Sequence, residues 1–258
     1  MIIYHRSSIA YVTIATLSLL RAFDSNLFST KKRSFDDSGL QGKYFICLFP
    51  MSRYGLNSLD RCFSLIVMAA PRVLVFGHSF VRRLKEFVER YSHDLSLDFG
   101  VPSINVFWHG IGGRTVRKIV SFDLHVVESF KPDIVILQLG TNDLTTLQAT
   151  TVGSELEDLV RLLHDNFGVK IVCVCQTIKR ETCGPAFRHK VGLLCRYLKV
   201  VLEPLPYAIY WSHRGFWNTR QRIFCADGVH LNNLGHFKLY RSMRGAVLRA
   251  VKHLNELA

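Results

Sequence analysis

Short apolar runs alternate with amphipathic stretches over most of this chain. From residue 72 onward the apolar runs are rich in β-branched side chains, which is typical of strands that are buried on both faces. The runs that we predict to be strands lie at residues 73–76, 104–108, 134–139, 170–175 and 207–211. The stretches that we predict to be helices lie at residues 80–91, 115–130, 154–167, 185–202 and 233–257. This alternation predicts an α/β fold with about five parallel strands and helices on both faces of the sheet.

Polar residues and glycine mark the expected ends of two of these helices. Ser154 and Glu157 have the spacing of a capping box, so we expect them to open the helix over 154–167. Gly168 follows the last apolar position of that helix and should terminate it. Asn232 precedes the last amphipathic stretch and should cap it.

Residues 1–69 do not share this alternation. An apolar run at 9–20 resembles the core of a signal peptide, but Arg21 follows it at once and no cleavage site is evident. The run is also short for a stable transmembrane helix. A secretory signal, a membrane-associated arm and a poorly structured extension all remain open. We expect the extension, and we place the compact domain at residues 70–258.

The charge of the chain is strongly positive. Lys and Arg exceed Asp and Glu by 13 over 258 residues, and residues 1–70 account for only 4 of that excess. Such a balance favours anionic partners in general and says nothing about fold. The basic residues form no dense tract and no nucleic-acid-binding motif, so a solvated basic surface is the simpler interpretation.

Seven cysteines are spread along the chain, and none forms a recognisable metal motif. Cys173 and Cys175 lie two apart in a predicted strand, so we expect them to share one buried face. No Cys or His pair has the spacing of a zinc site. Buried free thiols point to a reducing, cytoplasmic location. Secretion through residues 1–22 is the alternative.

The first three predicted strands each end in a polar or glycine-rich turn. These turns are residues 77–79, 110–113 and 140–143. The carboxyl ends of parallel strands meet at one edge of a sheet, where α/β proteins bind their ligands. The loop that carries Asp227 and His230 precedes the last helix, so it can return to the same edge.

Ser79 is the candidate nucleophile at this edge. It lies where a strand turns into a helix, although a plain helix-capping serine is a common alternative. A serine hydroxyl needs a base, and His230 can act as one while Asp227 orients its other ring nitrogen. Backbone N–H groups of Ser79 and Gly113 and the side-chain amide of Asn142 could stabilise an oxyanion.

Four segments together resemble the SGNH hydrolases, the GDSL-type esterase superfamily. The segments are residues 76–80, 110–115, 139–143 and 227–231, of which the second and third resemble platelet-activating-factor acetylhydrolase catalytic subunits. The resemblance implies a flavodoxin-like three-layer α/β/α sandwich and no metal or organic cofactor. It also implies hydrolysis of a small-molecule ester through an acyl-serine intermediate.

Site residues follow from the same resemblance. It assigns the triad to Ser79, Asp227 and His230, and the oxyanion hole to Ser79, Gly113 and Asn142. One departure is His78, which stands where the family usually has Asp before the nucleophile.

Three further interpretations accompany these assignments. We expect the side chain of His78 to diverge from that of Ser79 and not to replace His230 as the base. Asp143 is expected to hold its turn. The loop at residues 212–217 could border a substrate pocket, or it could be a packing loop.

Two other functions remain open at this point. The first is a non-catalytic binding module with an SGNH-like fold. The second is a basic, nucleic-acid-associated protein of the mobile-element type, for which only the charge argues.

Overall fold

The computed structural model describes residues 44–47, 66–91, 104–216 and 222–257. Strands β1 (Tyr44–Cys47) and β2 (Ile66–Ala69) pair antiparallel as a two-stranded sheet. The chain divides into the units Met1–Gln41 and Gly42–Ala258, and all described residues belong to the second. The apolar run at 9–20 therefore lies outside the described residues, and the domain boundary at residue 70 stays a prediction.

Five strands form one parallel sheet, as predicted. They are β3 (Arg72–Gly77), β4 (Asn105–Gly110), β5 (Ile134–Gln138), β6 (Ile171–Cys175) and β7 (Ala208–Trp211). Their order in the sheet is β4-β3-β5-β6-β7, and every neighbouring pair is parallel. The chain leaves β3 towards β4 on one side and later returns to β5 on the other side. The carboxyl end of β3 is thus the point where the strand order reverses, and ligands of open α/β sheets bind at such a point.

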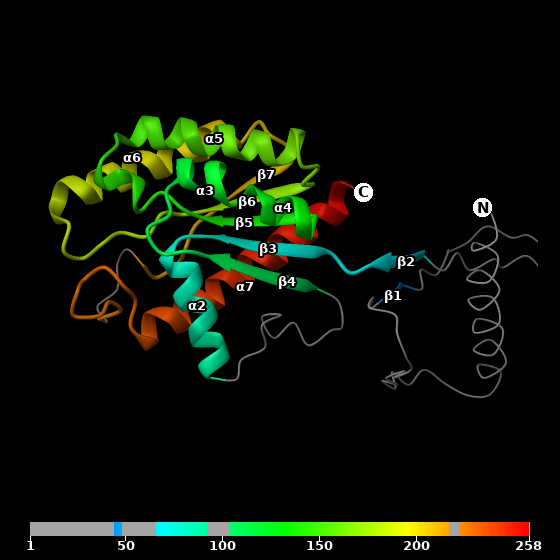
Figure 1. Ribbon diagram of the computed structural model, residues 1–258, viewed down its shortest axis with the longest axis horizontal. Coiled ribbons are helices and arrows are strands. Elements are labelled where there is room, and N and C mark those ends of the chain that lie inside the picture. The colour runs from blue at the N-terminus through cyan, green and yellow to red at the C-terminus, as the bar shows by residue number, and fades with distance from the viewer. Residues whose placement is uncertain (1–43, 48–65, 92–103, 217–221, 258) are drawn as a thin grey trace, which may run out of the picture. The chain divides into compact units, whose positions relative to one another are not determined.

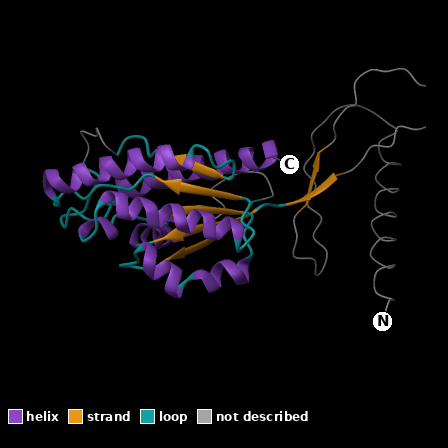
Figure 2. Cartoon of the chain, turned by 90° about the horizontal axis from the view of Figure 1, so that it is seen from above, coloured by secondary structure: helices purple, strands orange, loops and turns teal. Residues whose placement is uncertain are grey.

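Helices cover both faces of the sheet (Figures 1 and 2). They are α2 (Ser79–Arg90), α3 (Val116–Phe122), α4 (Leu124–Phe130), α5 (Ala149–Asp165), α6 (Gly184–Leu202) and α7 (Asn233–Leu257). Val73 and Val75 belong to the apolar cluster that contains α2 and α7. Leu74 and Phe76 belong to the cluster with α3 to α6. This alternation buries both faces of β3, at about 1.5–3 kcal/mol for each large apolar side chain.

The prediction of one helix over residues 115–130 is wrong. Helix α3 ends at Phe122 and α4 begins at Leu124, with Asp123 between them. The Asp123 N–H still donates to the Ile119 carbonyl at 2.9 Å, which closes α3, and its own carbonyl accepts from Val126 N–H at 3.1 Å. The apolar spacing runs through this break, so the sequence pattern alone could not reveal it.

The predicted capping box is also wrong. Helix α5 begins at Ala149, so Ser154 lies inside the helix and does not cap it. The buried positions Ala149, Val152 and Leu156 extend the apolar stripe towards the N-terminus, and burial of this stripe outweighs the local capping signal.

Two other helix-end predictions are confirmed. Gly168 has a φ of +66° and donates its N–H to the His164 carbonyl at 3.2 Å just beyond the end of α5. The Asn232 side-chain oxygen accepts from Gly235 N–H at 3.0 Å and caps α7.

Candidate active site

The turn after β3 places Ser79 as the first residue of α2. The capping position belongs to His78, whose Nδ1 accepts from Phe80 N–H at 3.4 Å. Ser79 is therefore not the helix cap, and its side chain is half-buried at the start of the helix. Gly77 makes this turn possible, because a Cβ there would overlap the carbonyl oxygen of Gln138 on β5.

His78 is buried and electrically neutral. Only 1% of the residue is exposed, and its ring packs against Phe80 with centroids 5.0 Å apart. Burial is the main cause that lowers the pKa of His78 to about 3, followed by the electrostatic effects of Arg180 and then of His230. An imidazole with so low a pKa is a poor proton acceptor near neutral pH.

The turn after β4 lies against the end of β3. Ile111 N–H donates to the Gly77 carbonyl at 3.2 Å, and Arg114 N–H donates to the Ile111 carbonyl at 3.4 Å. Gly113 is exposed in this turn with a φ of +73°, a conformation that favours glycine. Its N–H has no hydrogen-bond acceptor among the described residues, so it is available to a ligand.

Asn142 links the turns that follow three strands. Its Nδ2 donates to the Arg114 carbonyl at 2.8 Å, and its Oδ1 accepts from Arg180 Nη2 at 2.7 Å. These two contacts determine which side of the amide is nitrogen. Because the amide nitrogen carries two hydrogens, one remains for a ligand after the bond to Arg114 is made.

Asp143 holds the same turn, as predicted. Its Oδ1 accepts from Val116 N–H at 2.8 Å, so the carboxyl group anchors the first turn of α3. The residue has 0% exposure, and burial raises the pKa of its carboxyl group.

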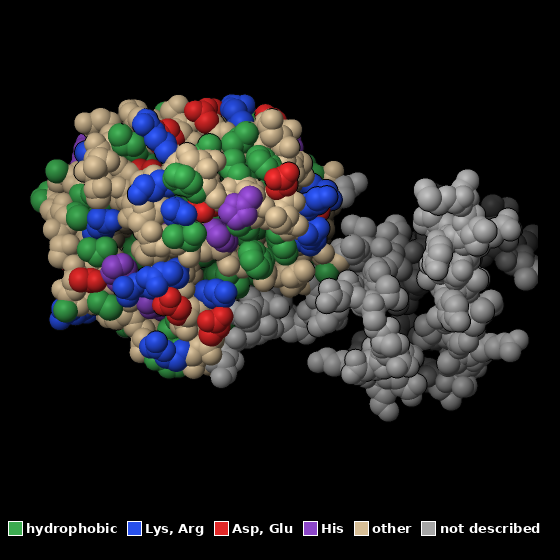
Figure 3. All heavy atoms as spheres, in the orientation of Figure 1, with side chains coloured by type: hydrophobic (Ala, Val, Ile, Leu, Met, Phe, Trp, Pro, Cys, Tyr) green, Lys and Arg blue, Asp and Glu red, His purple; other side chains and the backbone are tan. Residues whose placement is uncertain are grey.

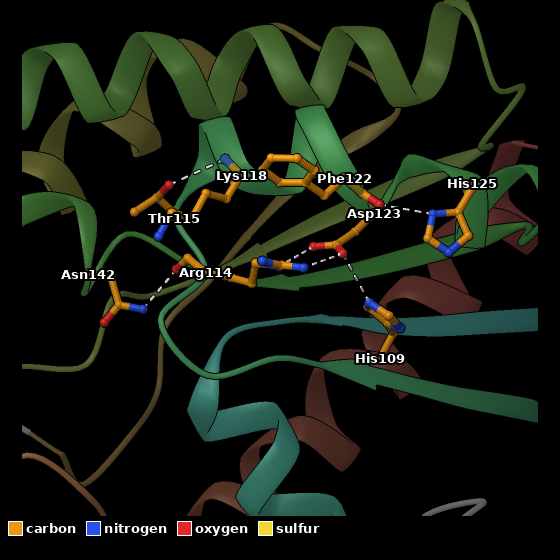
Figure 4. A network of polar contacts seen from close by, with 8 residues as sticks. All are labelled: His109, Arg114, Thr115, Lys118, Phe122, Asp123, His125 and Asn142. Carbon is orange, nitrogen blue, oxygen red and sulfur yellow. Dashed lines mark hydrogen bonds and ion pairs between the residues drawn. The ribbon is translucent and has the colours of Figure 1, made fainter.

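An ion-pair network lies behind the turn after β4 (Figure 4). Arg114 Nε and Nη2 donate to the two carboxylate oxygens of Asp123 at 2.7 and 3.0 Å. Asp123 is only 2% exposed, and His109 Nε2 lies 3.7 Å from its Oδ1. Sequence reasoning missed this network. The nine-residue separation of Arg114 and Asp123 fits no helical or strand period, so no simple signal could have found the pair.

Asp227 and His230 form a hydrogen-bonded pair just before α7. Asp227 Oδ2 lies 2.6 Å from His230 Nδ1, and Oδ1 accepts from the N–H groups of Val229 and His230 at 2.9 Å each. The backbone N–H of His230 first, and then its ring, hold the pKa of the Asp227 carboxyl well below its usual range. With Nδ1–H bound to the carboxylate, Nε2 of His230 is left as the acceptor.

His230 lies near the turn that carries Ser79. His230 is one of the groups that lower the pKa of buried His78, which directly precedes Ser79. A backbone bond of 2.7 Å from Cys225 N–H to the His230 carbonyl holds the loop on the other side. Among the hydrogen bonds of the described residues, none joins Ser79 to His230. The structure therefore brings the two residues to one edge of the sheet without joining them, and their pairing stays a prediction.

The loop at residues 212–217 contributes to packing. His213 and Phe216 are each only 2% exposed, and Phe216 belongs to the apolar cluster of α2 and α7. The ring of His213 lies 2.7 Å from both Gln138 Oε1 and Ser242 Oγ. These positions fit a packing loop and not the edge of a substrate pocket. Trp217 lies outside the described residues.

The described residues offer no metal site. In this part of the chain, no three His, Cys, Asp or Glu side chains gather closely enough to hold an ion. Cys173 and Cys175 are both buried on the α2 and α7 face, as predicted, and burial raises the pKa of the Cys175 thiol. No helix in the described ranges has both the length and the apolar character needed to cross a membrane.

Several solved structures share this fold at low sequence identity. An acetylxylan esterase from Geobacillus stearothermophilus, solved as a catalytic mutant, is 17% identical with a TM-score of 0.55, over 69% of this chain and 94% of that one. The lipase/acylhydrolase from Enterococcus faecalis is 17% identical with a TM-score of 0.55, over 69% of this chain and 95% of that one. An alpha/beta hydrolase enzyme from the metagenome of Lake Arreo, Spain, is 16% identical with a TM-score of 0.54, over 70% and 96%.

Family comparison gives the assignment. No curated protein matches the chain. The model of the GDSL-like Lipase/Acylhydrolase family matches residues 75–237, which begin in β3 and end in the first turns of α7. Because this match spans more than half of the 258 residues, the chain belongs to the GDSL-like lipase/acylhydrolase family of the SGNH superfamily and is a carboxylic ester hydrolase.

Proposed function

We propose that this hydrolase is a serine esterase that cleaves an O-acyl ester through an acyl-serine intermediate. The observation that carries the proposal is the 2.6 Å contact between Asp227 and His230 on the loop that precedes α7. This contact leaves the Nε2 of His230 as a base, and Ser79 is half-exposed at the turn after β3.

In the first half of the reaction, Ser79 Oγ attacks the acyl carbon while its proton passes to His230 Nε2. Asp227 keeps the imidazole in the required tautomer and stabilises the imidazolium. Collapse of the tetrahedral intermediate breaks the bond to the alcohol oxygen, which takes the proton from His230. Water then attacks the acyl-serine with His230 as base, which releases the carboxylic acid and restores Ser79.

We assign three donors to the oxyanion of each intermediate. They are the N–H groups of Ser79 and Gly113 and the remaining amide hydrogen of Asn142. Arg180 and the Arg114 carbonyl hold the amide in its orientation at 2.7 and 2.8 Å. Loss of one such donor typically raises the barrier by about 3–4 kcal/mol.

The mechanism requires Ser79 Oγ and His230 Nε2 to approach to hydrogen-bond distance. Catalytic hydrogen bonds are often long or poorly aligned without substrate and tighten when it binds. The side chain of His230 is 24% exposed and that of Asp227 is 48% exposed, so both are accessible to solvent.

Steady-state hydrolysis of 4-nitrophenyl acetate tests this proposal. We expect Ser79→Ala to lower kcat by at least about 1,000-fold, because no other group replaces the nucleophile. Ser154→Ala is the matched control, since Ser154 is exposed on α5 far along the chain from the site. Full activity of Ser79→Ala, with circular dichroism like that of the unaltered protein, would show that the assignment is wrong.

A further inference from the structure

A cavity of about 580 Å³ lies between α2 and the segment that leads into α7. Helix α2 contributes Arg83, Phe87 and Arg90 to its lining, and the opposite side includes Leu231 and His236. Basic, acidic and histidine side chains gather over α2 on the face seen in Figure 3. The cavity plays no part in the mechanism above.

Two lining residues lie close along the chain to the candidate catalytic residues Ser79 and His230. Arg83 lies four residues after Ser79, so the two share one side of α2, about 6 Å apart along the helix axis. Leu231 directly follows His230 in the chain. The backbone of Cys225, another lining residue, bonds to the His230 carbonyl at 2.7 Å. A substrate held at Ser79 could therefore extend into this cavity.

The charges around the cavity favour an anion. Arg83 and Arg90 form no ion pair with any described residue. Glu86 is the acidic residue of the lining, and Arg82 already pairs with it at 3.1 Å. Within the part of the chain that the structure describes, neither guanidinium group has an ion-pair partner, and guanidinium forks bind carboxylate or phosphate groups well.

Two lining residues also carry buried polar atoms that could bind a ligand. His236 is only 7% exposed, and its Nε2 is buried without a hydrogen-bond partner among the described residues. The Nε of Arg83 is in the same state. Buried polar atoms in native proteins are nearly always paired, so these two atoms need an account. Phe87 and Leu231 give the cavity apolar walls beside them.

We infer that this cavity binds the anionic end of the ester substrate. The inference rests on the proposed function, because it takes the ester to react at Ser79. The substrate would carry a carboxylate or phosphate group, joined by a short apolar spacer to the ester bond. Arg83, and Arg90 beyond it, would bind the charge, while Phe87 and Leu231 contact the spacer.

Two matched ester pairs test which part of the substrate carries the charge. For the acyl part, the pair is 4-nitrophenyl hemiadipate and 4-nitrophenyl hexanoate, which have equal chain length. For the alcohol part, the pair is 3-carboxyphenyl acetate and 3-carbamoylphenyl acetate. The measured quantity is the ratio of kcat/KM for the anionic ester to that for the neutral ester. We expect the unaltered protein to prefer the anionic ester in one of the two pairs.

Removal of the arginines should lower this ratio. Hydrogen bonds to charged groups contribute enough that the double variant Arg83→Gln with Arg90→Gln should lower the ratio by about 10- to 100-fold. Arg90→Gln alone, at an exposed position, should lower it less, and Arg83→Lys should keep part of it. Lys85→Gln is the control. This substitution removes one positive charge from the same helix. Lys85 lies outside the lining of the cavity, and its side chain is 44% exposed.

The outcomes distinguish the anion site in the cavity from the proposed role of Ser79 as nucleophile. No preference for an anionic ester in either pair would overturn the inference. A ratio that stays unchanged in both Arg90→Gln and the double variant would also overturn it. An equal decrease of the ratio in Lys85→Gln would overturn it too, because the preference would then come only from the overall positive charge of the helix. If Ser79→Ala stays active while the ratio still depends on the arginines, the proposed nucleophile fails and the anion site stands. If Ser79→Ala is inactive while the ratio does not depend on the arginines, the proposed nucleophile stands and the anion site fails.

Discussion

Two histidines near the carboxyl edge of the sheet have opposite surroundings. His213, which follows β7, contacts the neutral groups Gln138 Oε1 and Ser242 Oγ at 2.7 Å each. His213 is 2% exposed, and burial lowers the pKa of its ring to about 3. His230, which precedes α7, contacts the Asp227 carboxylate, and 24% of its side chain is exposed.

The comparison teaches what allows a histidine to transfer protons. Gln138 Oε1 accepts a hydrogen bond, so His213 Nε2 must carry the hydrogen and Nδ1 must accept from Ser242. Trp211 Nε1–H donates to the same Ser242 oxygen at 3.1 Å, which leaves the hydroxyl hydrogen for His213. Both nitrogens of His213 are therefore satisfied in the neutral form. His230 has an anion on one nitrogen and solvent access for the other, as a general base requires.

Substitution of each of these two histidines by Gln gives the largest expected difference in activity. We expect His230→Gln to lower kcat/KM for 4-nitrophenyl acetate by about 10,000-fold or more, because Ser79 loses its base. His213→Gln should keep kcat/KM within about threefold. It should lower the free energy of unfolding by about 1–3 kcal/mol, because buried hydrogen bonds are lost. Hydrolysis assays and denaturant unfolding of both variants measure these quantities. Equal losses of activity in the two variants would contradict the distinction.

The next effect concerns the oxyanion donors. Asn142→Ala should lower kcat by about 100- to 1,000-fold with little change in KM, because the amide acts mainly on the transition state. Arg180→Gln should lower kcat by about 10-fold, since Arg180 only orients the Asn142 amide at 2.7 Å. Arg188→Gln, at an exposed position of α6, is the matched control and should change neither constant. A rise in KM alone for Asn142→Ala would instead indicate a role in substrate binding.

The last effect, a change of about 2 kcal/mol for each histidine, is on stability at acidic pH. Burial is the main cause that lowers the pKa of His78 and His213 to about 3 and that of His236 to about 4, from 6.5. Unfolded chains take up these protons below pH 6.5 and the folded protein does not, so stability is full above pH 6.5 and falls as the pH falls towards 3. Each histidine should lower the free energy of unfolding by about 2 kcal/mol between pH 6.5 and pH 5.

Urea unfolding at pH 7 and pH 5 measures this dependence. His213→Gln should lose less stability over that interval than the unaltered protein, because one titrating group is gone. An equal or greater loss in the variant would show that His213 does not carry its share of the pH dependence.

The sequence pattern predicted the architecture because each strand repeats a strong local signal. The buried apolar run of β3 and the glycine at its end, Gly77, both follow from backbone and burial requirements that act over a few residues. The polar ends of three strands could be placed at one edge for the same reason. The prediction of the turn residue Asp143 as structural also succeeded, although its partner, the N–H of Val116, lies 27 positions away and could not be named from the sequence.

Features that depend on distant pairs could not be predicted. Asp123, at the break between α3 and α4, pairs with Arg114, and the orientation of the Asn142 amide depends on Arg180, which is 38 positions away. The hydrogen bond of His213 Nδ1 depends on Ser242, on a helix that begins 20 residues later. No periodicity in the chain encodes such contacts, so only the folded structure reveals them.

The central claim is that Ser79 is the activated nucleophile of this hydrolase. A fluorophosphonate reagent followed by peptide mapping with mass spectrometry tests it most directly, because the reagent needs an activated serine and no knowledge of the substrate. We predict one adduct on the peptide that contains Ser79, and its loss in His230→Gln. Absence of labelling in the unaltered protein, or an adduct on another serine, would contradict the account, and absence would favour a non-catalytic binding module.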